Sequence, residues 1–261
     1  MIRSSLAVCC AMLAAPLISP SHPESRPAAA RYRIEVQTET VVDLSSFGGA
    51  STTILQNIVA WVSVTLADTT GGRTIHAVID SARAESTPPV LSQASADSAK
   101  GGYLHGYTDA RNRIRALKPS PNAGMVAEAL GVIMNAFLPR VPSAEGGVDT
   151  SEVNSETPTQ NIKINVTTTY TRGGSESVAG VQGTRYNTAF TMSTSGTLES
   201  PMGTAQVQGT GTGSGSELLG PDGLYLGGSR TANISQTLTM GAAPAAIPVA
   251  VKQAITVTYL P

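Results

Sequence analysis

The amino-acid sequence predicts a mainly β fold. We expect a large curved antiparallel sheet, an unclosed barrel of about nine to eleven strands, wrapped around one buried apolar helix. Three observations lead to this prediction. Apolar and polar residues alternate with a period of two along most of the chain, Gly, Asp and Pro turns separate the alternating runs, and a single segment, residues 122–138, has its apolar residues at helical spacing instead.

The first alternating runs lie between residue 31 and the helix. In one of them Ala60, Val62 and Val64 alternate with Trp61 and Ser63, as in a strand with one face buried and the other in water. The strands expected in this half are residues 31–42, 54–67, 73–84 and 102–117, the last of them as a hairpin.

The helical segment, residues 122–138, reads NAGMVAEALGVIMNAFL and contains a single charged residue, Glu128. Val126, Leu130 and Ile133 recur at helical spacing. A helix that is apolar around most of its circumference is buried on most sides. We therefore expect it to lie in the concavity of the sheet.

The second half of the chain alternates more regularly. Ile162, Ile164 and Val166, for example, point to one face and Lys163 and Asn165 to the other. Segments 85–100 and 140–158, rich in Ser, Pro, Glu and Ala, are expected to be loops. The strands expected here are residues 160–171, 183–194, 203–215, 223–240 and 248–260.

The N-terminus predicts export. A basic start at Arg3 is followed by an apolar run that is too short to span a membrane, and then by Ser and Pro residues. We expect residues 1–30 to be a signal peptide and a short processed or disordered N-terminus, with cleavage after Ser21 or Ala30. Lipidation of Cys9 or Cys10 is an alternative. The single domain would span residues 31–261, in the periplasm, associated with the outer membrane, or secreted.

Composition excludes several classes of function. The chain is 41% hydrophobic, 13% charged and 4% aromatic, and its net charge is −1. It lacks the basic excess of a nucleic-acid-binding protein, and no apolar run after the N-terminus is long enough to cross a membrane. No cofactor motif, metal-ligand spacing or nucleophile motif is present, so we expect neither cofactor nor metal and no enzyme. The alternative of a hydrolase would require His76, His105 and Asp80, or other carboxylates, to form a compact cluster at one opening.

Two further segments stand out. Arg111, Arg113 and Arg115 alternate in a strand-like run; this is the pattern of a solvated face, with contact to an anion as the alternative. In the segment AQVQGTGTGSG, residues 205–215, alternate positions are glycine, which indicates close packing or strand bending in preference to a ligand site.

Size suggests a cavity. Nine or ten strands spaced by about 4.8 Å form a sheet roughly 45 Å wide, whereas a helix is about 10–12 Å wide. The helix therefore covers only part of the apolar face, and the remainder requires a curled sheet, a second layer or a ligand.

This plan resembles the half-barrel superfamily of periplasmic lipoprotein carriers, or uncharacterised secreted bacterial proteins of the same architecture. The resemblance rests on the strand and helix arrangement and on the segment FLPRVP, residues 137–142, followed by Gly146 and Gly147. The sequence has one clear helix where the carriers have several.

The resemblance implies a cell-envelope protein that binds an acyl chain or other lipid. The cavity would be lined by Met134, Phe137, Phe190 and Met192. The alternative is a structural, adhesive or interaction protein of the cell envelope with no small-molecule ligand. The sequence does not indicate an oligomeric state.

Overall fold

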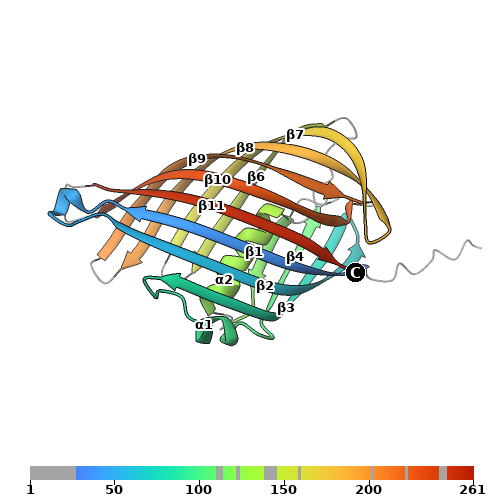
Figure 1. The fold of residues 1–261 in the computed structure, drawn as a ribbon, viewed down its shortest axis with the longest axis horizontal. Coiled ribbons are helices and arrows are strands. Elements are labelled where there is room, and N and C mark those ends of the chain that lie inside the picture. Colours follow the sequence, from blue (N-terminus) through green and yellow to red (C-terminus); the bar gives the residue numbers. More distant parts are fainter. Residues whose placement is uncertain are drawn as a thin grey trace, which may run out of the picture.

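A single antiparallel sheet of eleven strands forms most of the structure (Figure 1). The computed structural model describes residues 28–109, 114–121, 124–137, 146–157, 160–200, 203–220, 223–240 and 246–261. The strands are β1 (Ala28–Val42), β2 (Thr52–Thr69), β3 (Gly72–Thr87), β4 (Tyr103–Asp109), β5 (Ile114–Pro119), β6 (Gly146–Thr157), β7 (Gln160–Val178), β8 (Val181–Ser200), β9 (Gly203–Leu219), β10 (Tyr225–Met240) and β11 (Ala246–Leu260).

The strand order is β5-β4-β3-β2-β1-β11-β10-β9-β8-β7-β6. Strands β1 and β11 are neighbours at the centre, where Arg31 pairs with Leu260 and Val42 with Val249. Strands β5 and β6 are the two edges and do not pair with each other, so the sheet is unclosed. The predicted mainly β fold, with a large unclosed antiparallel sheet, is confirmed.

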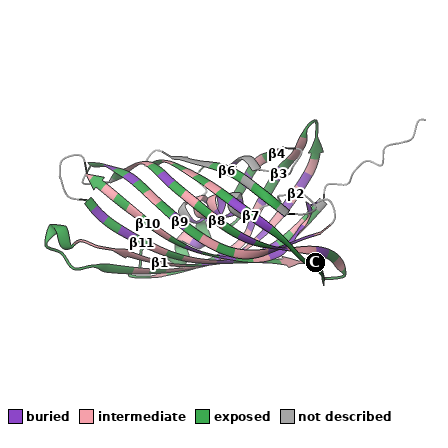
Figure 2. Ribbon diagram, turned by 90° about the horizontal axis from the view of Figure 1, so that it is seen from above, coloured by how far each residue is buried: buried purple, intermediate pink, exposed green. Residues whose placement is uncertain are grey.

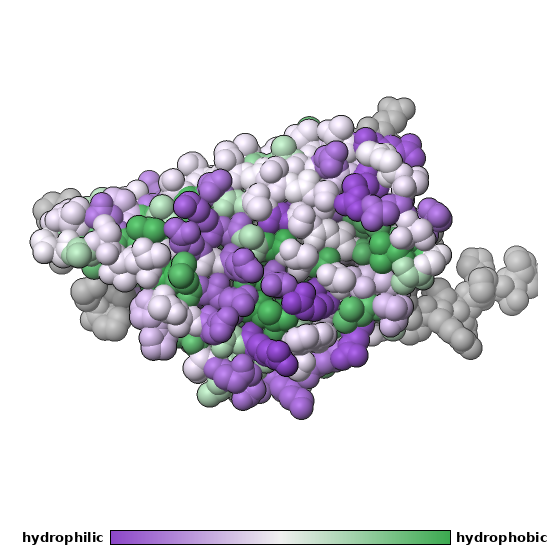
Figure 3. All heavy atoms as spheres, in the orientation of Figure 1, coloured by the Kyte–Doolittle hydropathy of each residue, from purple (hydrophilic) through white to green (hydrophobic). Residues whose placement is uncertain are grey.

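Buried and exposed residues alternate in bands along the strands (Figure 2), so the core lies on one face of the sheet. In β2, Ala60 and Val62 have no exposed surface while Trp61 between them is partly exposed. Tyr32 packs its ring edge-on against Tyr259 at 6.0 Å. The outer face seen in Figure 3 mixes charged and weakly polar side chains with scattered hydrophobic ones.

Two regions differ from the sequence prediction. Residues 146–157, expected to be a loop, form β6, which pairs along its length with β7. Their polar Ser, Glu and Asn residues do not show the apolar alternation from which strands are predicted, because an edge strand needs little apolar surface. The other expected loop, 85–100, contains the end of β3 and the short helix α1 (Gln93–Ser98), whose first turn is capped by the Ser92 hydroxyl accepting from Ser95 N.

The first strand also begins three residues earlier than the expected start at residue 31. Ala28, Ala29 and Ala30, assigned to the processed N-terminus, belong to β1 and pair with Leu66, Thr65 and Val64 of β2. Residues 1–27 lie outside the described residues.

The predicted helix is present as α2 (Gly124–Phe137), and its Val126, Ala127 and Leu130 have no exposed surface. It contacts α1 and the strands β4, β5 and β6. A 3-10 turn, η1 (Ser45–Phe47), connects β1 to β2. No helix among the described residues is both long and apolar enough to span a membrane.

Candidate functional site

A cavity of about 310 Å³ lies between α2 and the inner face of the second half of the sheet. Ala129, Val132 and Ile133 of α2 form one wall. The other residues that line it come from β7, β8, β10 and β11, and they are Ile164, Val166, Phe190, Met192, Arg230, Thr231, Ala232, Ile234, Gln253 and Ile255.

The glycines of β9 shape the sheet wall of this cavity. A Cβ atom on Gly213 would lie 2.2 Å from Cζ of Phe190, and one on Gly211 would lie 2.9 Å from Cγ of Met192. Phe190 and Met192 pair with these two glycines across β8 and β9, so their side chains lie over bare backbone. The glycine run therefore serves close packing, as its sequence pattern indicated.

A buried ion pair stands at one end of the cavity. Arg230 on β10 donates to the carboxylate of Glu217 on β9, and the two side chains are 5% and 2% exposed. The guanidinium carbon of Arg230 lies 5.7 Å from the ring centroid of Phe190, within range of a cation–π contact. Arg230 is thus the charged residue in an otherwise largely apolar lining.

Burial is the largest single influence on the pKa of Arg230 and lowers it, but the interactions with Glu217, Tyr170 and Tyr225 together hold that pKa above its ordinary value. Arg230 therefore stays protonated, and its charge is matched by Glu217. The inward position of Arg230 follows from strand alternation. Arg230 is two residues from Ala232 on β10, so both side chains point to the inner face.

Tyrosines surround this ion pair. Tyr32 donates its hydroxyl to the backbone oxygen of Tyr225 at 3.0 Å, and Tyr170 and Tyr186 meet edge to face at 6.5 Å. Burial, reinforced by Glu217, raises the pKa of Tyr225 well above the ordinary tyrosine value. Tyr225 is therefore a neutral hydrogen-bonding group at neutral pH.

Two buried threonine hydroxyls lie on the same inner face. Thr168 on β7 and Thr188 on β8 are 0% and 4% exposed, and neither Oγ1 has a hydrogen-bond partner among the described residues. Thr168 pairs with Phe190, while Thr188 pairs with Gly215, whose other partner is Arg230. The hydroxyls and the guanidinium thus stand at the same end of the inner face.

The four residues predicted to line a cavity, Met134, Phe137, Phe190 and Met192, differ in their positions relative to the observed cavity. Phe190 and Met192 line the cavity. Met134 is buried at 2% exposure but is not among the lining residues. Phe137 is the last residue of α2, and its side chain lies outside the described part of the chain. The sequence did not single out Arg230 or Glu217, although the inward parity of both was a usable signal.

Of the three alternating arginines, the structure describes only the position of Arg115. Arg111 and Arg113 lie outside the described residues, and Arg115 is in β5, an edge strand. The anion contact remains a prediction.

Of the three residues that a hydrolase site would need, the structure brings His76 and His105 together but not Asp80. His76 and His105 are directly opposite each other on β3 and β4. Asp80 is four positions farther along β3, about 13 Å at 3.3 Å per residue, and accepts hydrogen bonds from Ser63 at 2.9 Å and Arg31 at 2.9 Å. The structure therefore joins the histidines but holds Asp80 apart from them.

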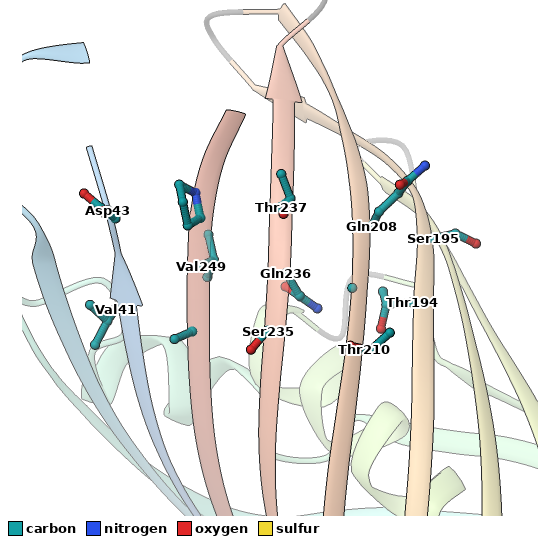
Figure 4. Close-up of a pocket in the computed structure, with 13 residues that line it drawn as sticks. Val41, Asp43, Thr194, Ser195, Gln208, Thr210, Ser235, Gln236, Thr237 and Val249 are labelled. Atoms are coloured by element: carbon teal, nitrogen blue, oxygen red, sulfur yellow. The ribbon is translucent and has the colours of Figure 1, made fainter. Parts of the chain in front are cut away.

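Two larger hollows have linings that are more polar than that of the cavity beside α2. One, of about 800 Å³, crosses β8 to β11 and the end of β1, and its lining includes Gln208, Ser235 and Thr237 (Figure 4). The other, of about 850 Å³, includes Glu39 and Lys252. We regard the smaller cavity as the candidate site because ligand sites combine an apolar wall with a few placed polar groups.

Comparison of the chain with models of protein families, with curated proteins and with solved structures finds no significant match.

Proposed function

We propose that the protein binds a hydrophobic small molecule, an acyl chain or similar lipid, in the cavity between the curved sheet and α2. We further propose that it does so as an exported protein of the cell envelope, in the manner of the carriers whose half-barrel plan it resembles. The observation that carries the proposal is the 310 Å³ cavity with walls from α2, β7, β8, β10 and β11. This volume lies at the lower end of the range of about 300–1,000 Å³ typical of ligand pockets.

The walls suit an apolar ligand. Val132, Ile164 and Ile234 present only hydrocarbon to the cavity, and an apolar cavity excludes water and accepts apolar molecules. Each buried methylene contributes about 0.8 kcal/mol, so a chain with about eight buried methylenes would gain roughly 6 kcal/mol before the cost of ordering it.

The test begins with native mass spectrometry of the protein purified from a periplasmic preparation. The expected result is an added mass that disappears on organic extraction, together with binding of a hydrophobic fluorescent dye that decanol displaces.

A matched pair of variants locates the ligand. Ala232→Leu adds bulk to the cavity wall, and Ala189→Leu adds the same bulk to the exposed face of β8. We expect the first substitution to weaken dye binding about 10-fold or more, which corresponds to about 1.4 kcal/mol, and the second to leave it unchanged. Absence of any bound hydrophobe, or equal effects of the two substitutions, would reject the proposal and favour a structural or adhesive role in the envelope.

A further inference from the structure

We infer that the ligand of this cavity carries an uncharged hydrogen-bonding group, such as a hydroxyl, ester or amide, and not a free carboxylate or phosphate. This inference rests on the proposed function and concerns which hydrophobic molecules the site accepts. It is argued from the charge and hydrogen-bonding capacity at the polar end of the cavity.

The charge argument concerns Arg230. A lone buried guanidinium would attract an anionic head group, but Glu217 already supplies the matching negative charge at 2% exposure. An anionic ligand would bring a second negative group to the same guanidinium. Two carboxylates that share one site repel, and one of them must take up a proton. The site therefore disfavours anions.

The hydrogen-bonding argument concerns the hydroxyls. Arg230 carries five N–H donors, and the hydroxyls of Thr168 and Thr188 on the same inner face have no hydrogen-bond partner among the described residues. Buried polar groups are seldom left unsatisfied. Neither threonine is among the residues that line the cavity, but Thr168 pairs across the strands with the lining residue Phe190. A neutral polar group at this end of the cavity would therefore approach an unsatisfied hydroxyl without disturbing the ion pair.

The test compares decan-1-ol with decanoate, which have equal chain length, by displacement of a bound hydrophobic dye from the full-length protein. At pH 8 we expect decanol to bind about 10-fold or more tightly than decanoate. As the pH falls toward the ordinary carboxyl range near 4–5, decanoate becomes neutral and the difference should shrink, while decanol binding stays constant. This comparison needs no variant.

A charge variant then reverses the preference. Glu217→Gln leaves Arg230 without its matching charge, so decanoate should gain about 10-fold or more in affinity and raise the melting temperature of the variant. Glu39→Gln, which removes a carboxylate from the exposed pair with Lys252, is the matched control and should change neither ligand.

The outcomes separate the two claims. Binding of decanoate at pH 8 as tightly as decanol would overturn the uncharged-ligand inference while leaving the proposed function standing. Failure of both molecules to displace the dye, with no bound hydrophobe in native mass spectra, would remove the proposed function itself.

A different observation supports a second inference, independent of the cavity. His76 and His105 are the two histidines of the described chain, and they are directly opposed on the exposed face of β3 and β4. Ile79, three residues after His76 on β3, donates its N–H to the backbone oxygen of Gly102. Hydrogen-bonded and non-hydrogen-bonded pairs alternate along an antiparallel ladder. Residues 79, 77 and 75 therefore belong to hydrogen-bonded pairs, and the two histidines form a non-hydrogen-bonded pair. In such pairs the side chains are closest.

We propose that this histidine pair binds a divalent transition-metal ion such as Zn²⁺, Ni²⁺ or Cu²⁺, ions for which imidazole is a suitable ligand. Both rings pack beside Tyr103, at 5.3 Å and 6.0 Å between centroids. No group of three or more His, Cys, Asp or Glu residues able to hold a metal occurs in the described part of the chain. In the described structure each imidazole contacts the Tyr103 ring and not the other imidazole, so both rings would turn toward the ion to supply two ligands, and water would complete the coordination.

The test is calorimetric titration of Ni²⁺ and Zn²⁺ into the untagged full chain carrying His22→Asn, Cys9→Ser and Cys10→Ser, so that His76 and His105 are the only imidazole or thiolate ligands that remain. We expect a single site, weakened about 10-fold or more by either His76→Asn or His105→Asn. The control Thr65→Asn, on β2 beside His76, should bind as before. Absence of binding, or equal binding by the His and Thr variants, would overturn the proposal.

Discussion

The glycine run of β9 offers the sharpest test of how this sheet packs. A Cβ atom on Gly213 would lie 2.2 Å from Cζ of Phe190 and 2.2 Å from the backbone oxygen of Thr231. The ring can turn, but the backbone oxygen belongs to the neighbouring strand and can move only if β9 and β10 separate. Gly213→Ala is therefore an overpacking substitution, which costs about 1–3 kcal/mol and occasionally more.

The same strand provides a graded comparison. A Cβ atom on Gly211 would first meet the flexible Met192 side chain at 2.9 Å, so Gly211→Ala should cost less than Gly213→Ala. Gly174 on β7 has nothing within 4 Å of its Cβ position. Gly174→Ala should consequently be neutral, or stabilising by about 0.4–1 kcal/mol through the lower entropy of the unfolded chain.

The assay is equilibrium unfolding in urea, followed by circular dichroism. A loss of about 2 kcal/mol for Gly213→Ala changes the folding equilibrium roughly 30-fold and lowers the melting temperature by about 4–8 °C for a domain of this size. Phe190→Leu in the Gly213→Ala background should restore part of the loss, because the Thr231 contact would remain. Equal stability of Gly213→Ala and Gly174→Ala would refute the packing explanation.

Three further outcomes follow from the structure. Arg230→Met should lose about 3–5 kcal/mol in urea unfolding because Glu217 is left as an uncompensated buried charge, and the double variant with Glu217→Leu should recover most of that loss. Burial raises the pKa of Tyr32 and of Tyr225 above the ordinary value; their contribution to stability is complete below about pH 10 and is lost as the pH rises toward the higher folded values. Tyrosinate absorbance should therefore show these two phenols ionising only when the protein unfolds. If the protein is exported as proposed, N-terminal sequencing should show cleavage after Ser21, because cleavage after residue 30 would remove the first three residues of β1.

The sequence predicted the strands where one face is apolar. The run from Ala60 to Leu66 in β2 keeps its period of two, and its inward residues form part of the core. Strand β6 did not meet this criterion because it is an edge strand that pairs only with β7, through backbone hydrogen bonds and an ion pair between Glu152 and Lys163. Periodicity detects burial, and a strand held by its backbone carries little of that signal.

Less of the candidate site than of the fold could be predicted from the sequence. The glycine run and the inward position of Phe190 could be inferred from alternation within single strands. The pairing of Glu217 with Arg230, and that of His76 with His105, depends on register between strands, and register is set by turns and bulges that alternation does not reveal. One such irregularity, between Tyr225 and Gly227, falls in β10 just before Arg230.

The position of α2 explains why space remains on one side of it. Its contacts are with α1, β4, β5 and β6, so the helix is held by the elements near the two sheet edges. The cavity opens on its other side, where Ala129 and Val132 face β7, β8, β10 and β11. On that wall the glycines of β9 let Phe190 and Met192 lie over the backbone.

This arrangement separates stability from binding in a testable way. Leu at position 232 fills volume that packing leaves empty, and filling a cavity commonly stabilises a protein by about 0.5–2 kcal/mol. If the cavity exists to receive a ligand, Ala232→Leu should raise the melting temperature of the ligand-free protein while weakening dye binding. A variant that lost both stability and binding would indicate that residue 232 is already tightly packed, and that the space beside α2 is too small for the proposed ligand.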